Sequence, residues 1–460
     1  MYQIDFKKPI HVHFIGIGGI SMSGLAEILL QEQFTVSGSD SKESDITKLL
    51  ESLGAKVVIG QQASNITEDI DLIVYTAAIH PDNPEYAAAV ASGKPMLTRA
   101  QLLGQVMSNY RYPVAVAGTH GKTTTTSMLT HILLAADSDP TISVGGMLDA
   151  IGGNIRVGKS DYFVTEVCEY TNSYHAFHPL ISIILNVDAD HLDFFSGIEE
   201  IIQSFKTFAN ILPEHGSLII DGSLDCFNTI TEQLPARVVT FGLDPAYDYS
   251  AADITYDAEG YPSYTLLKQG DKVTEIKLHV HGLHNVSNSL AAIAAADILG
   301  MPQEAWSTGL SEFGGAKRRF EVKGDWNGVT IVDDYAHHPT EIKATLTSAK
   351  NTTHNEIWCV FQPHTYSRTK ALLPEFAEAL HLADHVVLAK IYAAREQDPG
   401  TISSQDIADL LQNTYHTDVI YLDTFEAIED YLINNCEKND LLITMGAGDV
   451  VNIGEDLLKK

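Results

Sequence analysis

The sequence has few cysteines, no long apolar run and few basic residues. Its four cysteines, Cys168, Cys226, Cys359 and Cys436, are scattered through 460 residues without a CxxC pair. This pattern argues against a disulfide framework or a structural zinc site and fits a reducing cytosol. No apolar stretch approaches the length of a membrane span, and the first residues lack the apolar core of a signal peptide. We therefore expect a soluble cytoplasmic protein.

Basic residues are outnumbered by acidic ones. The chain has 29 Lys and Arg against 60 Asp and Glu, which gives a formal charge of -31. Such a chain repels nucleic acid and anionic membranes, so neither is expected as a partner. Small anionic substrates remain compatible, because local basic groups and helix N-termini outweigh the distant field.

Three segments share one pattern: a short β-rich run, a Gly-rich or polar turn, and apolar residues at helical spacing. The β-rich runs are 11–15, 114–117 and 358–361, and the helical runs follow around 22–30, 128–133 and 372–380. Such alternation indicates parallel sheets with right-handed crossovers. The sequence thus predicts an α/β fold in three domains, over 1–108, 109–318 and 319–460. Turn signals between short β runs in 235–282 predict a small antiparallel insertion.

The strongest chemical signal is GTHGKTT at 118–124, between a β run and a helix. Glycines let backbone N–H groups converge on phosphate oxygens, and the helix N-terminus adds a favourable field. In this pattern Lys122 reaches the β- and γ-phosphates and the Thr123 hydroxyl binds Mg²⁺. Val116 stands where a strict Walker A motif needs glycine, so we predict a shortened phosphate loop. The alternative is a strand–helix turn with an incidental lysine.

A second glycine-rich turn, GIGGIS at 16–21, follows the first β-rich run. It matches the dinucleotide fingerprint at its first two glycines, but Ser21 occupies the third position. Asp40 lies at about the distance where an acidic residue holds a ribose hydroxyl. The pattern leaves both a nucleotide site and a plain tight turn open.

Acidic and imidazole groups follow two β runs in the middle third. Glu166 follows the run 162–165, and NVDADHLD, which contains His191, follows the run 181–185. Parallel sheets bind ligands at the carboxyl ends of their strands, and carboxylate oxygens suit Mg²⁺. A glutamate in such a place can be a solvated surface residue, but the nearby phosphate loop favours a metal role for Glu166 and His191.

Further polar clusters lie in the last 180 residues. HGLHNVSN at 281–288 precedes a helix predicted over 289–299, and its His and Asn either cap that helix or bind a purine edge. DDYAHHPTE at 333–341 and FQPHTYSR at 361–368 follow β runs without the HExxH spacing of zinc sites. Arg318 and Arg319 either clamp a carboxylate or phosphate, or form a solvated linker.

Together these segments resemble the Mur ligase family. The matching blocks are HFIGIGGISMSGLAE, GTHGKTTTTSML, NVDADHLDFF, HGLHNVSNSLAA, GAKRRFE, VDDYAHHPTEI and FQPHTYSRT. They stand in the family's order and span about residues 11–450. Folylpolyglutamate synthetases share the shortened phosphate loop, whereas the DDYAHHPTE and QPH blocks are specific to the muropeptide branch.

The resemblance implies an N-terminal Rossmann-like domain that binds a UDP-sugar, a central P-loop ATPase with a mostly parallel sheet, and a C-terminal Rossmann-like domain that closes over the cleft. It implies an ATP- and Mg²⁺-dependent ligase of peptidoglycan and cell wall synthesis, with UDP-N-acetylmuramate and L-alanine as substrates. ATP would convert the lactyl carboxylate into an acyl phosphate, which the amine of L-alanine would attack. Phosphoryl transfer of this kind needs cations and in-line positioning more than covalent help.

The resemblance also assigns roles to individual residues. The implied catalytic residues are Lys122, Glu166, His191, His337, His364 and Arg368. The implied metal ligands are Thr123, Glu166 and His191. The implied ATP contacts are Gly118, Thr119, His120, Gly121, Lys122, Thr123, Thr124, His284, Asn285, Asn288 and Arg318. The implied substrate contacts are Gly16, Gly18, Gly19, Ser21, Asp40, Arg319, Tyr335, His337, His364 and Arg368.

The sequence departs from the family's pattern at two positions and leaves alternatives open. Ser21 replaces a usual glycine, and Thr365 stands where arginine is common, so L-alanine binding would rely more on Arg368. Lys206 lies at a plausible distance for the carbamylated lysine of some relatives. The alternatives are a ligase that reattaches recycled murein peptide, a nicotinamide-dependent dehydrogenase, and a non-catalytic nucleotide-binding regulator. Monomer and homodimer both remain open.

Overall fold

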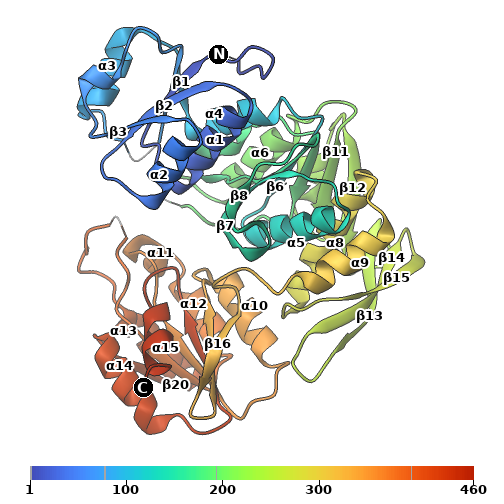
Figure 1. The fold of residues 1–460 in the computed structure, drawn as a ribbon. Helices are drawn as coiled ribbons and strands as arrows, with labels where there is room; N and C mark the ends of the chain where they lie inside the picture. Colours follow the sequence, from blue (N-terminus) through green and yellow to red (C-terminus); the bar gives the residue numbers. More distant parts are fainter. Residues whose placement is uncertain (1–2, 77–78, 193, 395) are drawn as a thin grey trace. The chain divides into compact units, whose positions relative to one another are not determined.

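The computed structural model describes residues 3–76, 79–192, 194–394 and 396–460 (Figure 1). The chain forms two compact units. The first contains Met1–Asp188, Ile198–Thr240 and Ala291–Gly309, and the second contains Ala189–Gly197, Phe241–Leu290 and Leu310–Lys460. Three elements pass from one unit into the other: β12 (Arg237–Gly242), α8 (Leu283–Ile298) and α9 (Gln303–Glu312).

The amino-terminal sheet of the first unit is wholly parallel, with the strand order β3-β2-β1-β4-β5. This is the order of a Rossmann sheet through its fifth strand. Val12, Phe14 and Ile15 of β1 are fully buried, as in a central parallel strand covered on both faces. The elements are β1 (His11–Ile15), α1 (Ile20–Gln31), β2 (Thr35–Asp40), α2 (Asp45–Ser52), β3 (Lys56–Ile59), η1 (Ala63–Asn65), β4 (Leu72–Tyr75), α3 (Pro84–Ser92), β5 (Met96–Thr98) and α4 (Arg99–Met107).

The second sheet places the strand before the phosphate loop at its centre. Within the first unit its order is β11-β10-β6-β9-β7-β8, and these neighbours are parallel except β7 and β8. Helix α5 packs against β6, β7 and β9 (Figure 1). The elements are β6 (Tyr112–Ala117), α5 (Lys122–Ala135), β7 (Thr141–Leu148), η2 (Asp149–Ile151), β8 (Gly153–Arg156), β9 (Tyr162–Glu166), η3 (Tyr170–Ala176), β10 (Ile181–Ile184), α6 (Ile198–Ala209), β11 (Ser217–Asp221) and α7 (Phe227–Thr231).

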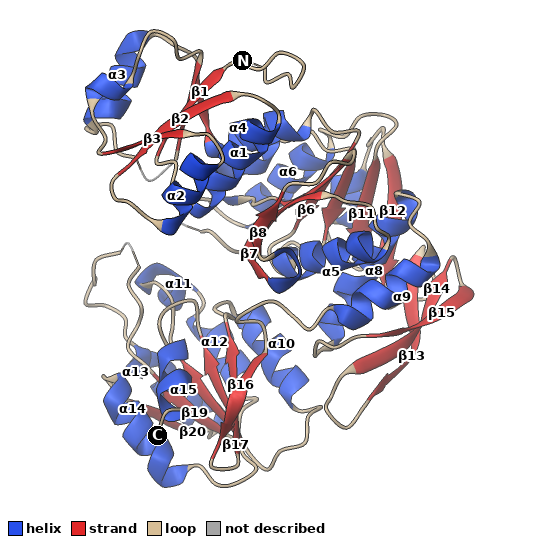
Figure 2. Ribbon diagram, viewed as in Figure 1, coloured by secondary structure: helices blue, strands red, loops and turns tan. Residues whose placement is uncertain are grey.

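The second unit contains three strands, β13 (Tyr249–Tyr256), β14 (Pro262–Lys268) and β15 (Asp271–Lys277), which pair antiparallel in that order. A six-stranded sheet follows, with the order β16-β17-β21-β18-β19-β20 and only β16 antiparallel to its neighbour (Figure 2). Its elements are β16 (Glu321–Trp326), β17 (Val329–Asp334), α10 (Pro339–Ala349), β18 (Ile357–Phe361), α11 (Tyr366–Ala371), α12 (Leu373–Leu380), β19 (His385–Leu388), α13 (Ser404–Leu410), η4 (Leu411–Tyr415), β20 (Asp418–Tyr421), α14 (Phe425–Asn435), β21 (Leu441–Met445) and α15 (Val451–Leu457).

Strand β18 shows how this sheet fills two cores. Cys359 and Phe361 join one cluster of buried residues, whereas the alternate residues Trp358 and Val360 join the other. Successive side chains of a strand point to opposite faces, so a strand covered on both sides is apolar at every position. The apolar run that marked this strand in the sequence reflects that double burial.

The predicted α/β class is confirmed by three mainly parallel sheets flanked by helices. Each predicted β-rich run forms a strand, and the antiparallel insertion is β13, β14 and β15. The third helical run, around 372–380, forms α12 (Leu373–Leu380), and the short helix α11 (Tyr366–Ala371) precedes it. The predicted helix start at Ser289 is wrong, because α8 begins at Leu283, directly after Gly282 at φ 96°. Residues 284–288 favour the helix only weakly, so their helical structure illustrates that tertiary context overrides propensity.

The two predicted domain boundaries fall outside regular elements. The boundary at 108/109 lies between α4 and β6, and the one at 318/319 lies between α9 and β16. Among the described residues, no helix has both the length and the apolar character needed to cross a membrane.

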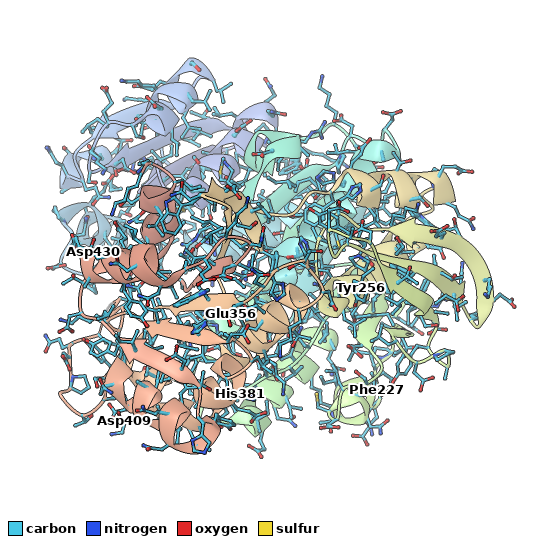
Figure 3. All side chains as sticks on the ribbon, turned by 90° about the horizontal axis from the view of Figure 1, so that it is seen from below. Phe227, Tyr256, Glu356, His381, Asp409 and Asp430 are labelled. Atoms are coloured by element: carbon cyan, nitrogen blue, oxygen red, sulfur yellow. The ribbon has the colours of Figure 1, made fainter. Side chains whose placement is uncertain are left out.

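His385 is held between two carboxylates on the six-stranded sheet. Its Nε2 lies 2.8 Å from Glu356 Oε2, its Nδ1 lies 2.7 Å from Asp418 Oδ2, and its ring stacks on Trp358. Figure 3 labels Glu356 among the side chains of this unit. Burial alone would lower the pKa of His385, but the hydrogen bonds and charges of the two carboxylates outweigh it and raise the pKa.

We expect His385→Gln to destabilise the protein at about pH 5.5 and to have a smaller effect at about pH 9. Because the folded-state pKa is raised, the stabilisation is complete below the unfolded pKa and is lost as the pH rises through the folded value. Solvent screening limits the charge contribution to about 0.5 kcal/mol. Thermal unfolding of the parent and of His385→Gln at the two pH values measures the difference in stability between them. A difference that does not change with pH would contradict the ionic contribution.

Candidate active site

The phosphate loop connects β6 to α5 at the centre of the second sheet. Gly118 has φ 142° and Gly121 has φ 83°, and both values favour glycine. A Cβ on Gly118 would also lie 2.9 Å from the Cβ of Leu185. The loop therefore needs glycine for its backbone path. Gly121 caps α5, so the loop directs backbone N–H groups and the positive helix end to one place.

Lys122, the first residue of α5, folds back over its own loop. Its Nζ donates to the Gly118 carbonyl at 2.5 Å and the Thr119 carbonyl at 3.0 Å, and lies 3.2 Å from Glu169 Oε2. Burial alone would lower the pKa of Lys122, but the carboxylate of Glu169 outweighs it and raises the pKa. The ammonium is thus charged and poised at the loop that the sequence assigned to phosphate.

Glu169→Gln is expected to destabilise the nucleotide-free protein, because the Lys122 ammonium loses its counter-charge. We expect a loss of about 2 kcal/mol. Nucleotide phosphates can replace the lost carboxylate, so a non-hydrolysable ATP analogue should raise the Tm of this variant more than that of the parent. Differential scanning fluorimetry measures both values. The control is Glu232→Gln, which removes the exposed partner of Lys206. Equal Tm values for variant and parent without nucleotide would contradict this role of Glu169.

Thr123 and Glu166 face each other beside the loop. The Thr123 hydroxyl donates to Glu166 Oε2 at 2.7 Å. Two glycines of β7 leave room for them: a Cβ on Gly145 would collide with Glu166, and one on Gly146 would lie 3.3 Å from Thr123 Cγ2. A hydroxyl and a carboxylate, adjacent to a phosphate loop, form the oxygen donor set that Mg²⁺ prefers. The residues present therefore fit a magnesium ion.

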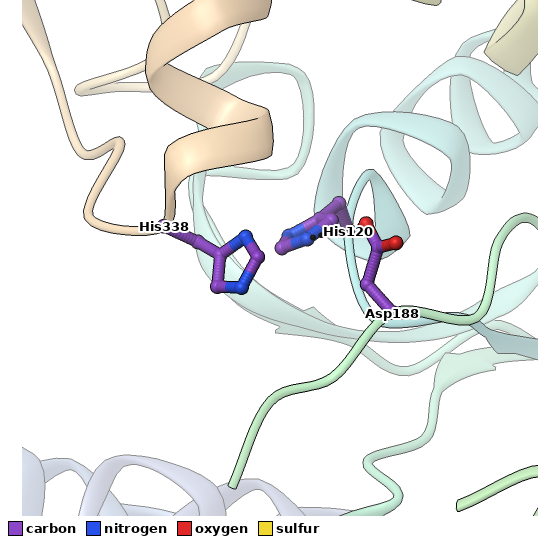
Figure 4. A group of neighbouring side chains, drawn as sticks. All are labelled: His120, Asp188 and His338. Carbon is purple, nitrogen blue, oxygen red and sulfur yellow. Dashed lines mark ion pairs between the residues drawn. The ribbon is translucent and has the colours of Figure 1, made fainter. Parts of the chain in front are cut away.

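The remaining loop residues are held by the end of β10. Asn186 accepts the His120 amide at 2.7 Å through its side chain and donates to the His120 carbonyl at 3.0 Å. The Asp188 amide donates to the Thr119 hydroxyl at 2.9 Å, and the His120 ring lies 3.2 Å from the Asp188 carboxylate (Figure 4). Thr124 is buried in the first turn of α5. Asn186 and Asp188 thus fix the shape of the loop.

The amino-terminal glycine turn closes on the end of β2. The amides of Gly16 and Ile17 both donate to the Ser39 carbonyl at 2.9 Å, and the Gly18 amide donates to the Asp40 carboxylate at 2.9 Å. Gly19 caps α1, and Ser21 lies in the first turn of that helix. The turn therefore has the strand–turn–helix context that the dinucleotide fingerprint requires. The Asp40 carboxylate lies against the turn.

In the second unit, Arg318 is bound to the six-stranded sheet. Its Nε lies 2.9 Å from Asp333 Oδ2, and its two terminal nitrogens donate to the carbonyls of Gly446 and Gly448. The ring of Tyr335 lies 4.9 Å from the guanidinium carbon of Arg318 and 5.4 Å from that of Arg319. Arg318 is thus held by three hydrogen bonds from its guanidinium nitrogens and lies over the Tyr335 ring.

His337, His364 and Arg368 come together in the second unit. The two imidazole rings are 5.7 Å apart, and Arg368 lies 3.2 Å from His364 Nδ1. Burial lowers the pKa of both histidines, that of His364 to about 4, so both are neutral at pH 7. Arg368 also forms a 2.7 Å ion pair with Asp190, whose pKa is lowered because the charges of Arg368 and His191 outweigh its burial. The arrangement offers one cation and two neutral imidazoles.

The remaining predicted residues of the second unit lie in two places. His191 follows Asp190 at φ 54°, and its amide donates to the Asp190 carboxylate at 2.7 Å. His284, Asn285 and Asn288 lie in the first turns of α8, where Asn288 donates to Asn285 at 2.9 Å. Desolvation by the surrounding protein and the charge of Arg319 lower the pKa of His284 to about 4. A neutral imidazole can both donate to and accept from a purine edge.

Sequence reasoning missed several residues that the fold brings next to predicted ones. Glu169 pairs with Lys122, Asn186 shapes the phosphate loop, Asp190 pairs with Arg368, and Asp333 holds Arg318. Asn186, Asp190 and Asp333 belong to polar segments at or just after the ends of strands, and Glu169 lies three positions after β9, so their position was the available signal. Lys206 forms an ion pair with Glu232 at 3.5 Å, and nothing in this contact indicates carbamylation.

Sequence models of three Mur ligase domains match successive parts of the chain. The Mur ligase family catalytic domain matches residues 11–111, the Mur ligase middle domain matches 116–296, and the Mur ligase glutamate ligase domain matches 318–448. Together these matches cover most of the chain.

Among curated proteins, the chain is 60% identical to the UDP-N-acetylmuramate–L-alanine ligase of Agathobacter rectalis over the full length of both. It is 59% identical to the enzyme of the same name from Lachnospira eligens, again over both full lengths. Among solved structures, the UDP-N-acetylmuramate-alanine ligase of Thermotoga maritima has a TM-score of 0.77 at 29% identity and 98% coverage of each chain. A murein peptide ligase from Psychrobacter arcticus has a TM-score of 0.66 at 25% identity, also over 98% of each chain.

Proposed function

This chain belongs to the Mur ligase family, and on that premise we propose that it joins L-alanine to the lactyl carboxylate of UDP-N-acetylmuramate. The family membership makes it an ATP-dependent ligase, and the proposed step belongs to peptidoglycan precursor synthesis. The observation that carries the substrate assignment is the 60% identity to an enzyme of that name over the whole chain. The Lys122, Thr123 and Glu166 geometry supports the ATP half of the reaction.

The proposed reaction has two steps. A lactyl carboxylate oxygen attacks the γ-phosphorus of ATP, ADP leaves, and an acyl phosphate forms. The amine of L-alanine then attacks the acyl carbon, loses a proton, and expels phosphate from the tetrahedral intermediate. Lys122 would stabilise the charge on the γ-phosphoryl oxygens, since its ammonium already lies at the phosphate loop.

Thr123 and Glu166 would hold Mg²⁺, with His191 as a further ligand. The ion would neutralise phosphate charge during the transfer. Gly118, Thr119, His120, Gly121 and Thr124 would shape the backbone around the phosphates. Glu166 and Thr123 are preorganised for this purpose, because their oxygens already lie 2.7 Å apart.

Two clusters of the second unit would bind the other parts of the substrates. His284, Asn285, Asn288 and Arg318 would contact the nucleotide base of ATP. Arg319, Tyr335, His337, His364 and Arg368 would contact the reacting groups and L-alanine. Neutral His337 and His364 can donate hydrogen bonds to the reacting groups or accept hydrogen bonds from them, because burial lowers the pKa of both imidazoles and keeps them uncharged at pH 7.

The first glycine turn would bind the UDP part of the sugar nucleotide. Gly16, Gly18, Gly19 and Ser21 surround the start of α1, where a helix N-terminus favours pyrophosphate. Asp40 would hold a ribose hydroxyl. We propose residues 1–108 as the UDP-sugar-binding domain, 109–318 as the ATP-binding domain, and 319–460 as the domain that closes the site.

The likeness to a murein peptide ligase supports one alternative, reattachment of a recycled peptide to the same sugar nucleotide. Phosphate release in the presence of UDP-N-acetylmuramate, Mg²⁺ and ATP separates the two proposals. We expect turnover with L-alanine and none with a murein tripeptide. Turnover with the tripeptide alone would overturn the L-alanine assignment.

A further inference from the structure

A buried polar network lies inside the amino-terminal sheet, where a central strand is expected to be apolar. His13 of β1 and Ser37 of β2 are register partners, so their side chains share one face with Ser39. The exposed fraction is 2% for His13 and 0% for both Ser39 and Glu85 of α3. The network therefore joins β1, β2 and α3 out of contact with solvent.

Glu85 is the centre of this network. Its Oε1 lies 2.8 Å from His13 Nε2, and its Oε2 accepts from the Ser39 hydroxyl at 2.5 Å. Ser37 lies 2.8 Å from His13 Nδ1 and 2.8 Å from His11 Nε2, so the hydrogen bonds continue along the strand pair. One carboxylate thus fixes two strands at once.

Helix α3 presents Glu85 from a firmly held end. The Asn83 side chain accepts the Glu85 amide at 3.0 Å and the Tyr86 amide at 3.1 Å, and Pro84 starts the helix. This cap satisfies amides that would otherwise lack partners. The carboxylate of Glu85 is therefore anchored by its own backbone as well as by its hydrogen bonds.

Ser39 transmits this anchoring to the glycine turn. Its hydroxyl donates to Glu85, while its backbone carbonyl accepts the amides of Gly16 and Ile17. The next residue, Asp40, accepts the Gly18 amide, and a Cβ on Gly18 would lie only 2.8 Å from the Asp40 carboxylate. A small shift of this strand end would therefore move the whole turn.

Burial of a carboxylate and an imidazole is costly, and apolar residues of similar volume often stabilise a fold as well or better. A polar network in this place is thus poorly explained by fold stability alone. We propose that Glu85, acting through Ser39, is a positioning residue that fixes the glycine turn for the pyrophosphate of the sugar nucleotide. The inference rests on the proposed function, since it takes UDP-N-acetylmuramate as the ligand of this turn.

The test compares Glu85→Ala, Glu85→Gln, Ser39→Ala and the control Leu72→Ala. Leu72 is fully buried at the start of β4, at the opposite end of the sheet from the turn. The readouts are the Tm, the Kd of UDP-N-acetylmuramate by calorimetry, and separate KM values for all three substrates.

We expect Glu85→Ala and Ser39→Ala to raise the Kd and the KM of UDP-N-acetylmuramate about tenfold. This factor corresponds to the free energy of one hydrogen bond to a charged group. Their kcat and their KM for ATP and L-alanine should stay within about twofold of the parental values. A change of that size is smaller than the effect of losing one hydrogen bond. Glu85→Gln should restore sugar-nucleotide binding, because its amide can still bond to Ser39 and to the other tautomer of His13. Leu72→Ala should lower the Tm without this selective loss.

Two results would overturn the positioning role. One is a sugar-nucleotide Kd in Glu85→Ala and Ser39→Ala equal to that of the parent, and the other is an equal loss in Leu72→Ala. If Glu85→Ala does not fold, Ser39→Ala carries the same test. Failure of the parent protein itself to bind UDP-N-acetylmuramate would instead reject the proposed function.

Discussion

Lys122→Ala is expected to lower kcat by about a thousandfold, the loss typical of removing a preorganised group that stabilises transition-state charge. The ammonium of Lys122 contacts its own loop carbonyls and Glu169, so it lies where the terminal phosphates of ATP would be bound. UDP-N-acetylmuramate should still bind with its parental Kd, because the glycine turn of the amino-terminal sheet does not include this residue. Coupled phosphate release and calorimetry measure the two quantities.

The matched control for that variant is Lys206→Ala. Lys206 is also on the first unit, but its ammonium pairs with Glu232 and not with the phosphate loop. Its loss should leave kcat close to that of the parent. Retained turnover in Lys122→Ala would contradict the assigned role, whatever the control shows.

Glu166→Gln is expected to lower kcat by about a hundredfold and to raise the Mg²⁺ concentration for half-maximal activity. Glutamine keeps the hydrogen bond that Thr123 donates but removes the charge that would bind the ion. Titration of phosphate release with Mg²⁺ separates the two effects. The control is Glu199→Gln in the first turn of α6, at an exposed position. An unchanged Mg²⁺ requirement in Glu166→Gln would exclude it as a ligand.

The phosphate loop could be predicted from the sequence because its chemistry is contiguous. Glycines at 118 and 121, Lys122 and Thr123 all stand within one strand–turn–helix segment, and the structure has that segment as β6, the loop and α5. The α/β class was predictable for a similar reason. Buried parallel strands and amphipathic helices leave apolar patterns that repeat along the chain.

The partners of these residues could not be predicted, because only the fold brings them together. Glu169 is 47 positions from Lys122, Asn186 is 66 from His120, and Glu85 is 72 from His13. No local spacing relates residues so far apart. The start of α8 was mispredicted for a related reason: the weak helix formers at 284–288 are helical within the tertiary structure.

Transfer of ¹⁸O from the lactyl carboxylate to phosphate distinguishes the acyl-phosphate route from hydrolysis of ATP by water. UDP-N-acetylmuramate labelled with ¹⁸O in both lactyl carboxylate oxygens is turned over with L-alanine, Mg²⁺ and ATP in ordinary water. If the carboxylate attacks the γ-phosphorus and the amine later expels phosphate, one ¹⁸O atom must appear in each released phosphate, and one must stay in the amide. Unlabelled phosphate would show that water accepted the phosphoryl group, and it would contradict an amide-forming ligase that proceeds through an acyl phosphate.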